Sequence, residues 1–585
     1  MDPVLPQHET DPTERLTQLA EAAEIYRYEH ESLAPVALAA EVPEHEEASL
    51  GYRLLVAQRM ITLAHNSKEV DQGHEDGRGS TAAVLLELFR AGKEGGMEGV
   101  HAEVTRLARR GMSGGRPESL ADYAELFQEL ELPAIAGHYR EDATFAEQRV
   151  SGANPVWLRR ASELPDHFPV SEEDFQASQP DDSLAAAQAE GRLYLADYAV
   201  LDGLECGDYP AAQKYLSAPL ALFVVPARGA RDLQPVAIQL EQRPGSSSPI
   251  VTPRDGWSWL DAKTRVQSAD GNCHQAISHL GRTHLPLDAV VLATHRNLAR
   301  NHPIFVLLSP HLEGTLSINE SANTSLLAPE GGVDVVLAGT IEATRAVAAR
   351  AASEWSLDDA GLPRDLELRG VDDAEVFPNY PYRDDGLLIW GAIQDWVRNY
   401  LTLYYPSDSE VQQDRELQAW VAELISPDYG RLRGLGQSGR IRTRDYLGQV
   451  LTTLIFTASA GHAAVNFPQC TAMTYVPNWP LASFTPARPG PHSEQDLLDL
   501  LPPLDVAHMQ VSLGYLLGSI YYTQLGQYPK TLIFDYFSDR RVREHEDRFN
   551  ERLAEIEVEI GVRNRARRAP YPHLLPSRIP QSTNL

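Results

Sequence analysis

The chain has 585 residues, and 51 Lys and Arg against 82 Asp and Glu leave a formal net charge of −31. Binding to nucleic acid or to an anionic membrane by charge needs a surplus of Lys and Arg, so this balance argues against both kinds of partner. Hydrophobic residues at 43% and charged residues at 23% are typical of soluble globular proteins, which argues against disordered and collagen-like chains.

The cysteines and the N-terminal segment indicate a compartment. Cys206, Cys273 and Cys470 lie far apart, so they form neither a disulfide framework nor a CxxC metal motif. The N-terminus lacks the basic start and apolar run of a secretory signal, and no apolar stretch approaches the roughly 20 residues that cross a membrane. We therefore expect a soluble, cytoplasmic protein without a transmembrane segment.

Helical periodicity dominates the chain. Helices are expected within residues 11–64, over 81–96 and around 100–132, with a polar loop at 66–80. Residues 221–227 and 235–242 predict one small β-hairpin. Long helical runs follow at 288–302, 384–405, 448–467 and 549–565. The fold is predicted to be mainly α, with a helical extension over 1–110 that could act as a lid and one large domain over 111–585.

Two motifs are expected to carry no function. Gly434, Gly436 and Gly439 spell GxGxxG, but no strand precedes them and no βαβ unit surrounds them, so a dinucleotide site is not expected. The triplets at Asn319 and Asn323 match the N-glycosylation pattern, which has no role in a cytosolic chain.

Six histidines are concentrated in residues 274–311, out of 19 in the chain. A single histidine is most simply a hydrogen-bonded core residue, but His274, His279 and His284 recur every five residues. Residues five apart diverge by about 140° on an α-helix, whereas a π-type turn brings them to one face. We therefore predict a π-bulge near His279 and a metal site.

A second cluster lies on the Ala-rich segment around residue 462. His462 and Asn466 are four residues apart, so both project from one helix face with an imidazole nitrogen and an amide oxygen. Taken alone they could equally be a buried polar pair. Together with the first cluster they favour a metal bound between two helices, although such an iron site would normally include one carboxylate.

These residues resemble the lipoxygenase family. The spacing His274-x4-His279-x4-His284-x17-His302-x8-His311 is similar to the family's histidine signature, with WLDAK before it and the HAAVNF helix after it. The similarity extends from about Glu141 to the last residue. It implies a large helical catalytic domain of the bacterial type, without the N-terminal β-barrel of animal and plant members.

The resemblance implies the metal ligands. They are His279, His284, His462, Asn466 and the terminal carboxylate of Leu585, where the family usually ends in Ile. The cofactor is expected to be one iron per chain, with manganese less favoured, and no catalytic side chain is expected beyond the metal-bound hydroxide. His274 is implied to be a histidine that does not bind the metal, and Gln275 and Gln469 are implied to link the ligands to the substrate cavity.

Six positions resemble the family's substrate pocket, and ordinary core packing explains each equally well. Ala322 corresponds to the position where Ala accompanies S-configured products. Gly271 stands where animal-type members carry an aromatic, so a deep pocket is expected. The complete set is Gly271, Ala322, Leu326, Val336, Leu337 and Leu513.

The implied function is a non-haem iron dioxygenase that converts polyunsaturated fatty acids of the linoleate or arachidonate type to S hydroperoxides. Two alternatives remain open: a hydroperoxide isomerase or epoxy-alcohol synthase on the same iron, and an inactive helical protein that binds fatty acids. The expected partners are a polyunsaturated fatty acid and O2. We expect a monomer with no nucleic acid and at most transient membrane contact.

Overall fold

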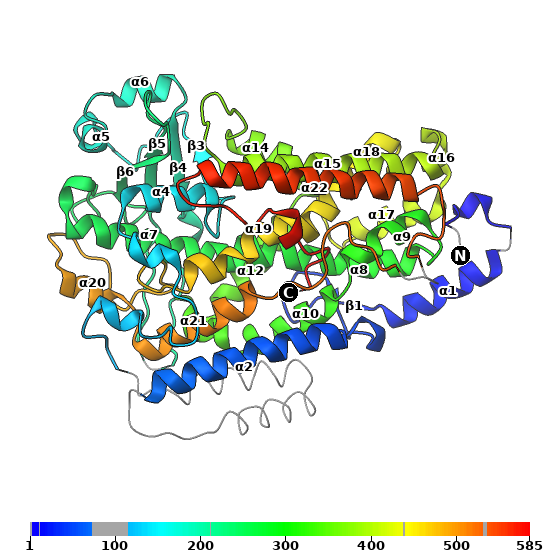
Figure 1. Ribbon diagram of the computed structural model, residues 1–585, viewed down its shortest axis with the longest axis horizontal. Coiled ribbons are helices and arrows are strands. Elements are labelled where there is room, and N and C mark those ends of the chain that lie inside the picture. Colours follow the sequence, from blue (N-terminus) through cyan, green and yellow to red (C-terminus); the bar gives the residue numbers. More distant parts are fainter. Residues whose placement is uncertain are drawn as a thin grey trace.

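A computed structural model describes residues 3–10, 12–72, 115–210, 212–436, 439–530 and 535–584. Long helices run side by side along the longest axis, and a small sheet lies at one end (Figure 1). The prediction of a mainly α fold with a small antiparallel β element is confirmed.

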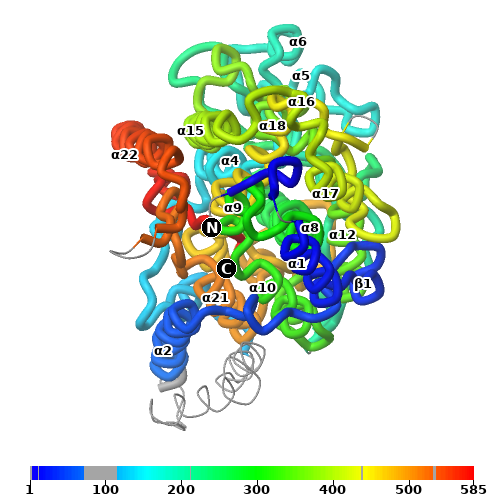
Figure 2. The backbone as a smooth tube through the Cα atoms, turned by 90° about the vertical axis from the view of Figure 1, so that its right-hand side faces the viewer, coloured from blue at the N-terminus to red at the C-terminus, as the bar shows by residue number. Residues whose placement is uncertain are grey.

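One continuous helix forms the centre of the molecule. It comprises α7 (Trp257–Cys273), the π-helix η7 (His274–His284) and α8 (Leu285–Asn297), and most of its side chains are buried. The packing partners of η7 and α8 include α12 (Ile341–Glu354), α17 (Arg415–Ile425) and α1 (Pro12–Ile25). Viewed along the long axis, α1 and α17 flank α8 (Figure 2). The predicted π-bulge is confirmed and extends over all 11 residues of η7.

A second long helix crosses the core beside η7. It comprises α18 (Arg444–Phe456), the π-turn η10 (Thr457–Gly461), α19 (His462–Asn466) and the π-turn η11 (Gln469–Met473). This helix is long and apolar enough to cross a membrane by composition, which differs from the sequence expectation. Its most apolar window is 94% buried inside the molecule, as in the core helix of a large domain.

The sheet has four antiparallel strands in the order β3 (Arg159–Arg160), β4 (Leu193–Asp197), β5 (Leu220–Val224) and β6 (Gln234–Gln239). The predicted hairpin is confirmed as β5 and β6, with Leu222 opposite Ala237. β3 was not predicted because two residues are too few for an alternating pattern, and β4 was not predicted either.

The N-terminal region differs in part from the expectation. α1 and α2 (Leu50–Gln72) are helices as predicted, but the strands β1 (Tyr28–Glu29) and β2 (Leu38–Ala39) pair between them. Residues 66–72, expected in a loop, continue α2. Residues 115–132, expected to be helical, contain only the short 3-10 helix Leu120–Tyr123. The helix expected over 81–96 lies outside the described residues.

Two pairs of long helices complete the layer around the core: α15 (Pro381–Tyr404) packs on α22 (Arg543–Ala566), and α2 packs on α21 (Leu504–Gly518). After α22 the chain turns inward, and its last described residues lie inside the molecule (Figure 1). The shorter helices are α4 (Asp142–Ser151), α5 (Glu172–Ser178), α6 (Leu184–Ala189), α9 (Pro303–Leu308), α10 (Thr315–Ser321), α11 (Gly332–Val336), α13 (Leu357–Ala360), α14 (Leu362–Arg369), α16 (Asp408–Gln413) and α20 (Glu494–Leu500).

The GxGxxG segment lies in the loop between α17 and α18. Gly434, Gly436 and Gly439 have φ values of 62°, 76° and 75°, which are left-handed conformations that glycine adopts without strain. In the described chain no parallel strand leads into this loop. The motif therefore serves turn geometry.

Candidate metal centre

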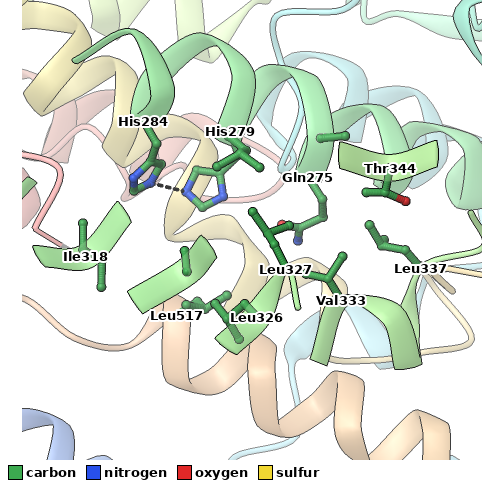
Figure 3. A pocket seen from close by; sticks show the side chains of 13 residues that line it. Gln275, His279, His284, Ile318, Leu326, Leu327, Val333, Leu337, Thr344 and Leu517 are labelled. Atoms are coloured by element: carbon green, nitrogen blue, oxygen red, sulfur yellow. Dashed lines mark hydrogen bonds between the residues drawn. The ribbon is translucent and has the colours of Figure 1, made fainter. Parts of the chain in front are cut away.

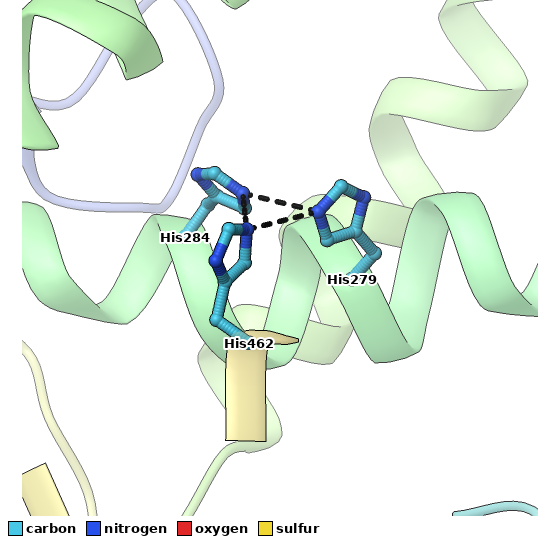
Figure 4. A group of neighbouring side chains, drawn as sticks. All are labelled: His279, His284 and His462. Carbon is cyan, nitrogen blue, oxygen red and sulfur yellow. Dashed lines mark hydrogen bonds between the residues drawn. The ribbon is translucent and has the colours of Figure 1, made fainter. Parts of the chain in front are cut away.

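Three histidines meet in the core. The Nε2 atoms of His279, His284 and His462 lie 3.0 to 3.2 Å from one another, and all three residues are buried. Figure 4 shows the three rings converging on one point from η7 and α19. Among the His, Cys, Asp and Glu side chains that the structure describes, these three form the group that is close enough together to hold a metal ion.

The π-helical geometry of η7 places His279 and His284 on one face although they are five residues apart. His274, the other histidine of the five-residue series, has a different role. His274 Nε2–H donates to the carbonyl of Val465 at 2.7 Å, so His274 ties η7 to α19 beside the cluster. This position agrees with the prediction that His274 does not bind the metal.

Asn319 on α10 orients His284. The Nδ1–H of His284 donates to Asn319 Oδ1 at 2.9 Å, which leaves the lone pair of Nε2 directed at the other two rings. The Asn319 amide in turn donates to Asp288 Oδ1 at 2.7 Å. The sequence analysis missed Asn319, which it dismissed as part of a glycosylation triplet; its spacing from the histidines gives no signal.

The three imidazoles are neutral at pH 7. Burial lowers the pKa of His284 to about 4, and burial together with the neighbouring imidazoles lowers the pKa of His279 and of His462 well below the usual range. Metal ligands must be unprotonated, so this neutrality suits a metal site.

The three nitrogens are arranged to hold a single metal ion. Three nitrogens that turn lone pairs toward one point cannot satisfy one another by hydrogen bonds, whereas a cation can accept all three. With metal–nitrogen bonds of about 2.1 Å, neighbouring nitrogens are about 3.0 Å apart at octahedral corners and about 3.4 Å apart at tetrahedral ones. The observed 3.0 to 3.2 Å falls within this range, so the three nitrogens are spaced as ligands of one metal ion.

Asn466 lies one turn after His462 and is fully buried. Its Oδ1 accepts a hydrogen bond from Gln469 Nε2 at 3.0 Å, and Gln469 Oε1 accepts one from Gln275 Nε2 at 2.7 Å. Since an amide oxygen has two lone pairs, Asn466 Oδ1 retains one for a metal. The hydrogen-bonded series Gln275–Gln469–Asn466 connects the cavity wall to Asn466, whose role as a metal ligand stays a prediction.

The C-terminal segment is threaded into the core. Residues 579–584 are buried, and the ring of His311 donates from Nδ1 to the carbonyl of Gln581 at 2.9 Å. Thr583 Oγ1 lies 3.0 Å from Thr315 Oγ1 on α10. Leu585 lies outside the described residues, so its predicted role as a ligand stays a prediction.

An apolar cavity of about 680 Å³ opens beside the histidines. Figure 3 shows His279, His284 and Gln275 on one wall, with leucines and Val333 facing them. The lining consists of Gln275, Ala276, His279, Leu280, His284, Ile318, Ala322, Leu326, Leu327, Val333, Leu337, Thr344 and Leu517. Its surface is almost entirely hydrocarbon, so the cavity is suited to an apolar chain and to the exclusion of water.

A second apolar cavity of about 450 Å³ shares five lining residues with the first: Gln275, Leu326, Val333, Leu337 and Leu517. It is also lined by Val336 and Leu513, so five of the six predicted pocket residues line one cavity or the other. Neither lining includes Lys or Arg. A bound carboxylate would therefore find no charged partner among these residues.

Gly271 is the exception and corrects the expected source of pocket depth. It lines neither cavity, and a Cβ added there would lie 2.6 Å from Leu481 Cδ2 and 3.1 Å from Trp479 Nε1. The space that an aromatic at position 271 would fill is already occupied by these two side chains. The expected opening at Gly271 is therefore absent, and Leu481 lines the second cavity instead.

Comparison with known proteins gives one family. The family model described as Lipoxygenase matches residues 118–571. A linoleate 9/13-lipoxygenase from Pseudomonas aeruginosa is 45% identical over 492 residues, covering 81% of this chain and 70% of that protein. The hydroperoxide isomerase ALOXE3 from Homo sapiens is 36% identical over 457 residues, covering 77% of this chain and 63% of that protein.

Solved structures agree with this similarity. The coral 8R-lipoxygenase aligns with a TM-score of 0.85 and 29% identity, covering 100% of this chain and 83% of its own. The arachidonate complex of delta413-417:GS LOX aligns with a TM-score of 0.83 and 28% identity, covering 100% of this chain and 84% of its own.

Proposed function

The chain belongs to the lipoxygenase family and is an oxidoreductase of the dioxygenase type, and from this premise we propose that it inserts O2 into linoleate- or arachidonate-type fatty acids. The observation that carries the proposal is the three-histidine cluster at the wall of the apolar cavity. A hydrocarbon chain that fills this cavity brings a carbon between two double bonds next to the metal position. The relatives that act on linoleate and arachidonate support this substrate class.

The proposed metal is iron, held by His279, His284 and His462 together with the amide oxygen of Asn466. Where the chain ends at Leu585, its terminal carboxylate completes the set and supplies the negative charge that three imidazoles and an amide lack. Bound iron supplies the one-electron redox chemistry that removes a hydrogen atom from the substrate carbon. Lengthening the chain by two glycines after Leu585 should then lower the iron content well below that of the unextended protein; equal iron content would remove Leu585 from the ligand set.

The chain's own residues position the substrate and exclude water. His274 and Asn319 fix the two helices and the ring of His284, so the ligand geometry is set before the substrate arrives. The leucines and valines of the cavity hold the hydrocarbon chain and keep water away from reactive intermediates. We further propose S-configured products, supported by the small side chain of Ala322 in the cavity wall. Chiral analysis of the reduced products tests this, and a predominantly R product would contradict it.

A hydroperoxide isomerase is the second candidate, favoured by the similarity to ALOXE3. The same metal and cavity can accept a preformed hydroperoxide, so the two reactions must be separated by substrate. Iron-loaded protein should be given linoleate with O2 and, separately, linoleate hydroperoxide without O2. The dioxygenase proposal predicts faster turnover of linoleate with the formation of conjugated dienes. Turnover of the hydroperoxide alone would instead establish the isomerase.

A further inference from the structure

A third cavity, of about 1150 Å³, borders the metal-bearing helices but shares no lining residue with the two apolar cavities. We call it the polar cavity. It lies among η7, the residues around α13 and α14, and the helix that joins α18 to α19. Its lining consists of Val156, Arg159, Ser278, Arg282, Thr283, Glu354, Trp355, Ser356, Asp359, Ala360, Leu362, Asp365, Leu368, Arg369, Tyr382, Phe456, Thr457, Gly461 and Val465.

Two polar side chains of η7 in this cavity have no partner. The guanidinium of Arg282 forms no hydrogen bond or ion pair with any residue that the structure describes, and the hydroxyl Oγ of Ser278 is buried without a partner there. Burial lowers the pKa of Arg282, and Asp365 opposes this only as a more distant charge. By contrast, the guanidinium of Arg369 in the same lining has partners: it donates hydrogen bonds to Asp365, to the Leu158 carbonyl and to Tyr380. The unpaired groups are therefore available to a ligand.

The chemistry of these groups selects the ligand. An arginine has five N–H donors, no acceptor and a fixed positive charge. The Arg282 guanidinium is only half-buried in the cavity wall and has no partner there, so the ligand that suits it best is an anion. The lining carries three arginines and three acidic residues, which leaves no net positive charge and favours a monoanion over a dianion such as phosphate. The apolar side chains of Trp355, Phe456 and Val465 complete the wall and suit a hydrocarbon group. We propose that the polar cavity binds a monocarboxylate with a hydrocarbon tail, held by Arg282 and Ser278.

This site goes beyond the proposed function, because it lies outside the substrate cavities. It also adjoins the metal centre, since Ser278 precedes His279, Thr283 precedes His284 and Gly461 precedes His462. A ligand bound to Arg282 therefore contacts η7, whose backbone also carries His279 and His284. Binding there has a direct route to the metal centre, as the coupling of an effector site requires.

Titration calorimetry of the full-length, metal-loaded protein with octanoate tests the proposal. Octanoate has no double bond, so it cannot be oxygenated. We expect wild type to bind octanoate both at the polar cavity and at the substrate cavity. Arg282→Gln should weaken binding at the polar cavity at least tenfold and leave binding at the substrate cavity unchanged. Arg364→Gln is the matched control, because Arg364 is exposed on α14 and lies outside the cavity lining. An Arg282→Gln isotherm identical to that of wild type would overturn the proposal, as would competition by inorganic phosphate at equal concentration.

Thermal unfolding separates binding from folding. Removing an unpaired guanidinium relieves a desolvation cost, so Arg282→Gln without octanoate should unfold at the same temperature as wild type or higher. A lower midpoint would show that Arg282 has a structural partner and would overturn the assignment. Ser278→Ala should keep its midpoint and bind octanoate several-fold more weakly at the polar cavity; unchanged binding would overturn the role of Ser278. Neither measurement depends on oxygenation, so failure here leaves the proposed function intact.

Discussion

Asn319 is the side chain beside the metal centre with the most specific hydrogen-bond arrangement. It accepts from His284 Nδ1–H and donates to Asp288, so it selects both the tautomer and the orientation of the His284 ring. Burial raises the pKa of Asp288 to about 7, while the hydrogen bond from Asn319 opposes this rise. The geometry of one metal ligand is thus set by a residue that does not touch the metal position.

Replacing Asn319 tests this role. Asn319→Ala should lower iron affinity by about 10- to 100-fold, the usual effect of removing the partner of a metal-bound histidine. Metal content after dialysis against a chelator series measures it. Asn323→Ala is the matched control, because Asn323 belongs to the neighbouring triplet and donates to Ser32 rather than bonding to a histidine. Equal iron retention in the two variants would show that Asn319 does not support His284.

Gly271 and Leu481 form a packed pair. Gly271→Ala places a methyl group 2.6 Å from Leu481 Cδ2, so we expect a loss of about 1–3 kcal/mol in unfolding free energy. Leu481→Ala makes room for that methyl group, so the double variant should lose less than the sum of the two single variants. Chemical denaturation measures all three.

Gly391→Ala provides the control for the Gly271 series, because no atom lies within 4 Å of a Cβ added there and α15 should gain helix propensity. If Gly271→Ala were as stable as Gly391→Ala, Leu481 could move aside freely. In that case Leu481 would not block the space beside Gly271.

At the residue scale, the sequence predicted the histidines better than their surroundings. The five-residue spacing carries direct information about one helix face, so His279 and His284 could be placed before the structure. Gly271 could not be judged in the same way, because Leu481 is 210 positions away and nothing in the sequence states that it fills the space. Asn319 was missed for the same reason: its partner is chosen by the packing of α10 on α8.

Among the elements, η7 sets the positions of His279 and His284, and residues 579–584 of the C-terminal segment are buried in the core. η7 is π-helical over its whole length, which aligns residues five apart and was foreseeable from the histidine spacing. The backbone of the C-terminal segment is fixed in the core, because the carbonyl of Gln581 accepts a hydrogen bond from the buried His311 ring. Residues 115–132 were predicted wrongly as a helix, because the sequence pattern did not distinguish a long helix from the short 3-10 helix that forms there.

The C-terminal segment gives a prediction about pH. Burial lowers the pKa of His311 to about 4, whereas an unfolded histidine titrates near 6.5. Between these values the unfolded chain binds a proton that the folded chain does not, so stability is full above pH 6.5 and falls toward pH 4. The slope is up to about 1.4 kcal/mol per pH unit for this one residue.

His311→Asn isolates that contribution, because the Asn amide can replace the Nδ1–H donor to Gln581 but does not titrate. Denaturant unfolding at pH 7, 6 and 5 should show a flatter dependence for His311→Asn than for wild type. Parallel curves would mean that His311 is protonated to the same extent in the folded and unfolded chains.

For the whole molecule, the family and the helical architecture followed from the sequence, because one extended run of ordered motifs covers most of the chain. The net charge of −31 acquires a specific meaning once the cavities are known. The linings of the two apolar cavities contain neither Lys nor Arg, so binding of a fatty-acid anion there has to overcome the repulsion of an acidic surface. Affinity must come from the hydrocarbon chain.

Salt should therefore favour substrate binding. Raising ionic strength from about 0.01 M to about 0.15 M shortens the screening length from about 30 Å to about 8 Å, so the KM for linoleate should fall. Methyl linoleate, which has no charge, is the control and should show no such change. A KM for linoleate that rises with salt would indicate an attractive site for the carboxylate.

Oxygen uptake tests whether the three-histidine cluster is the centre of a dioxygenase. Iron-loaded wild type and His462→Ala are given linoleate in parallel, and the iron content of each is determined. Wild type should hold about one iron per chain and consume one O2 for each conjugated diene formed, while His462→Ala should lose both iron and uptake. Wild type that holds iron but consumes no O2 with linoleate or arachidonate would contradict the account, as would full activity in His462→Ala.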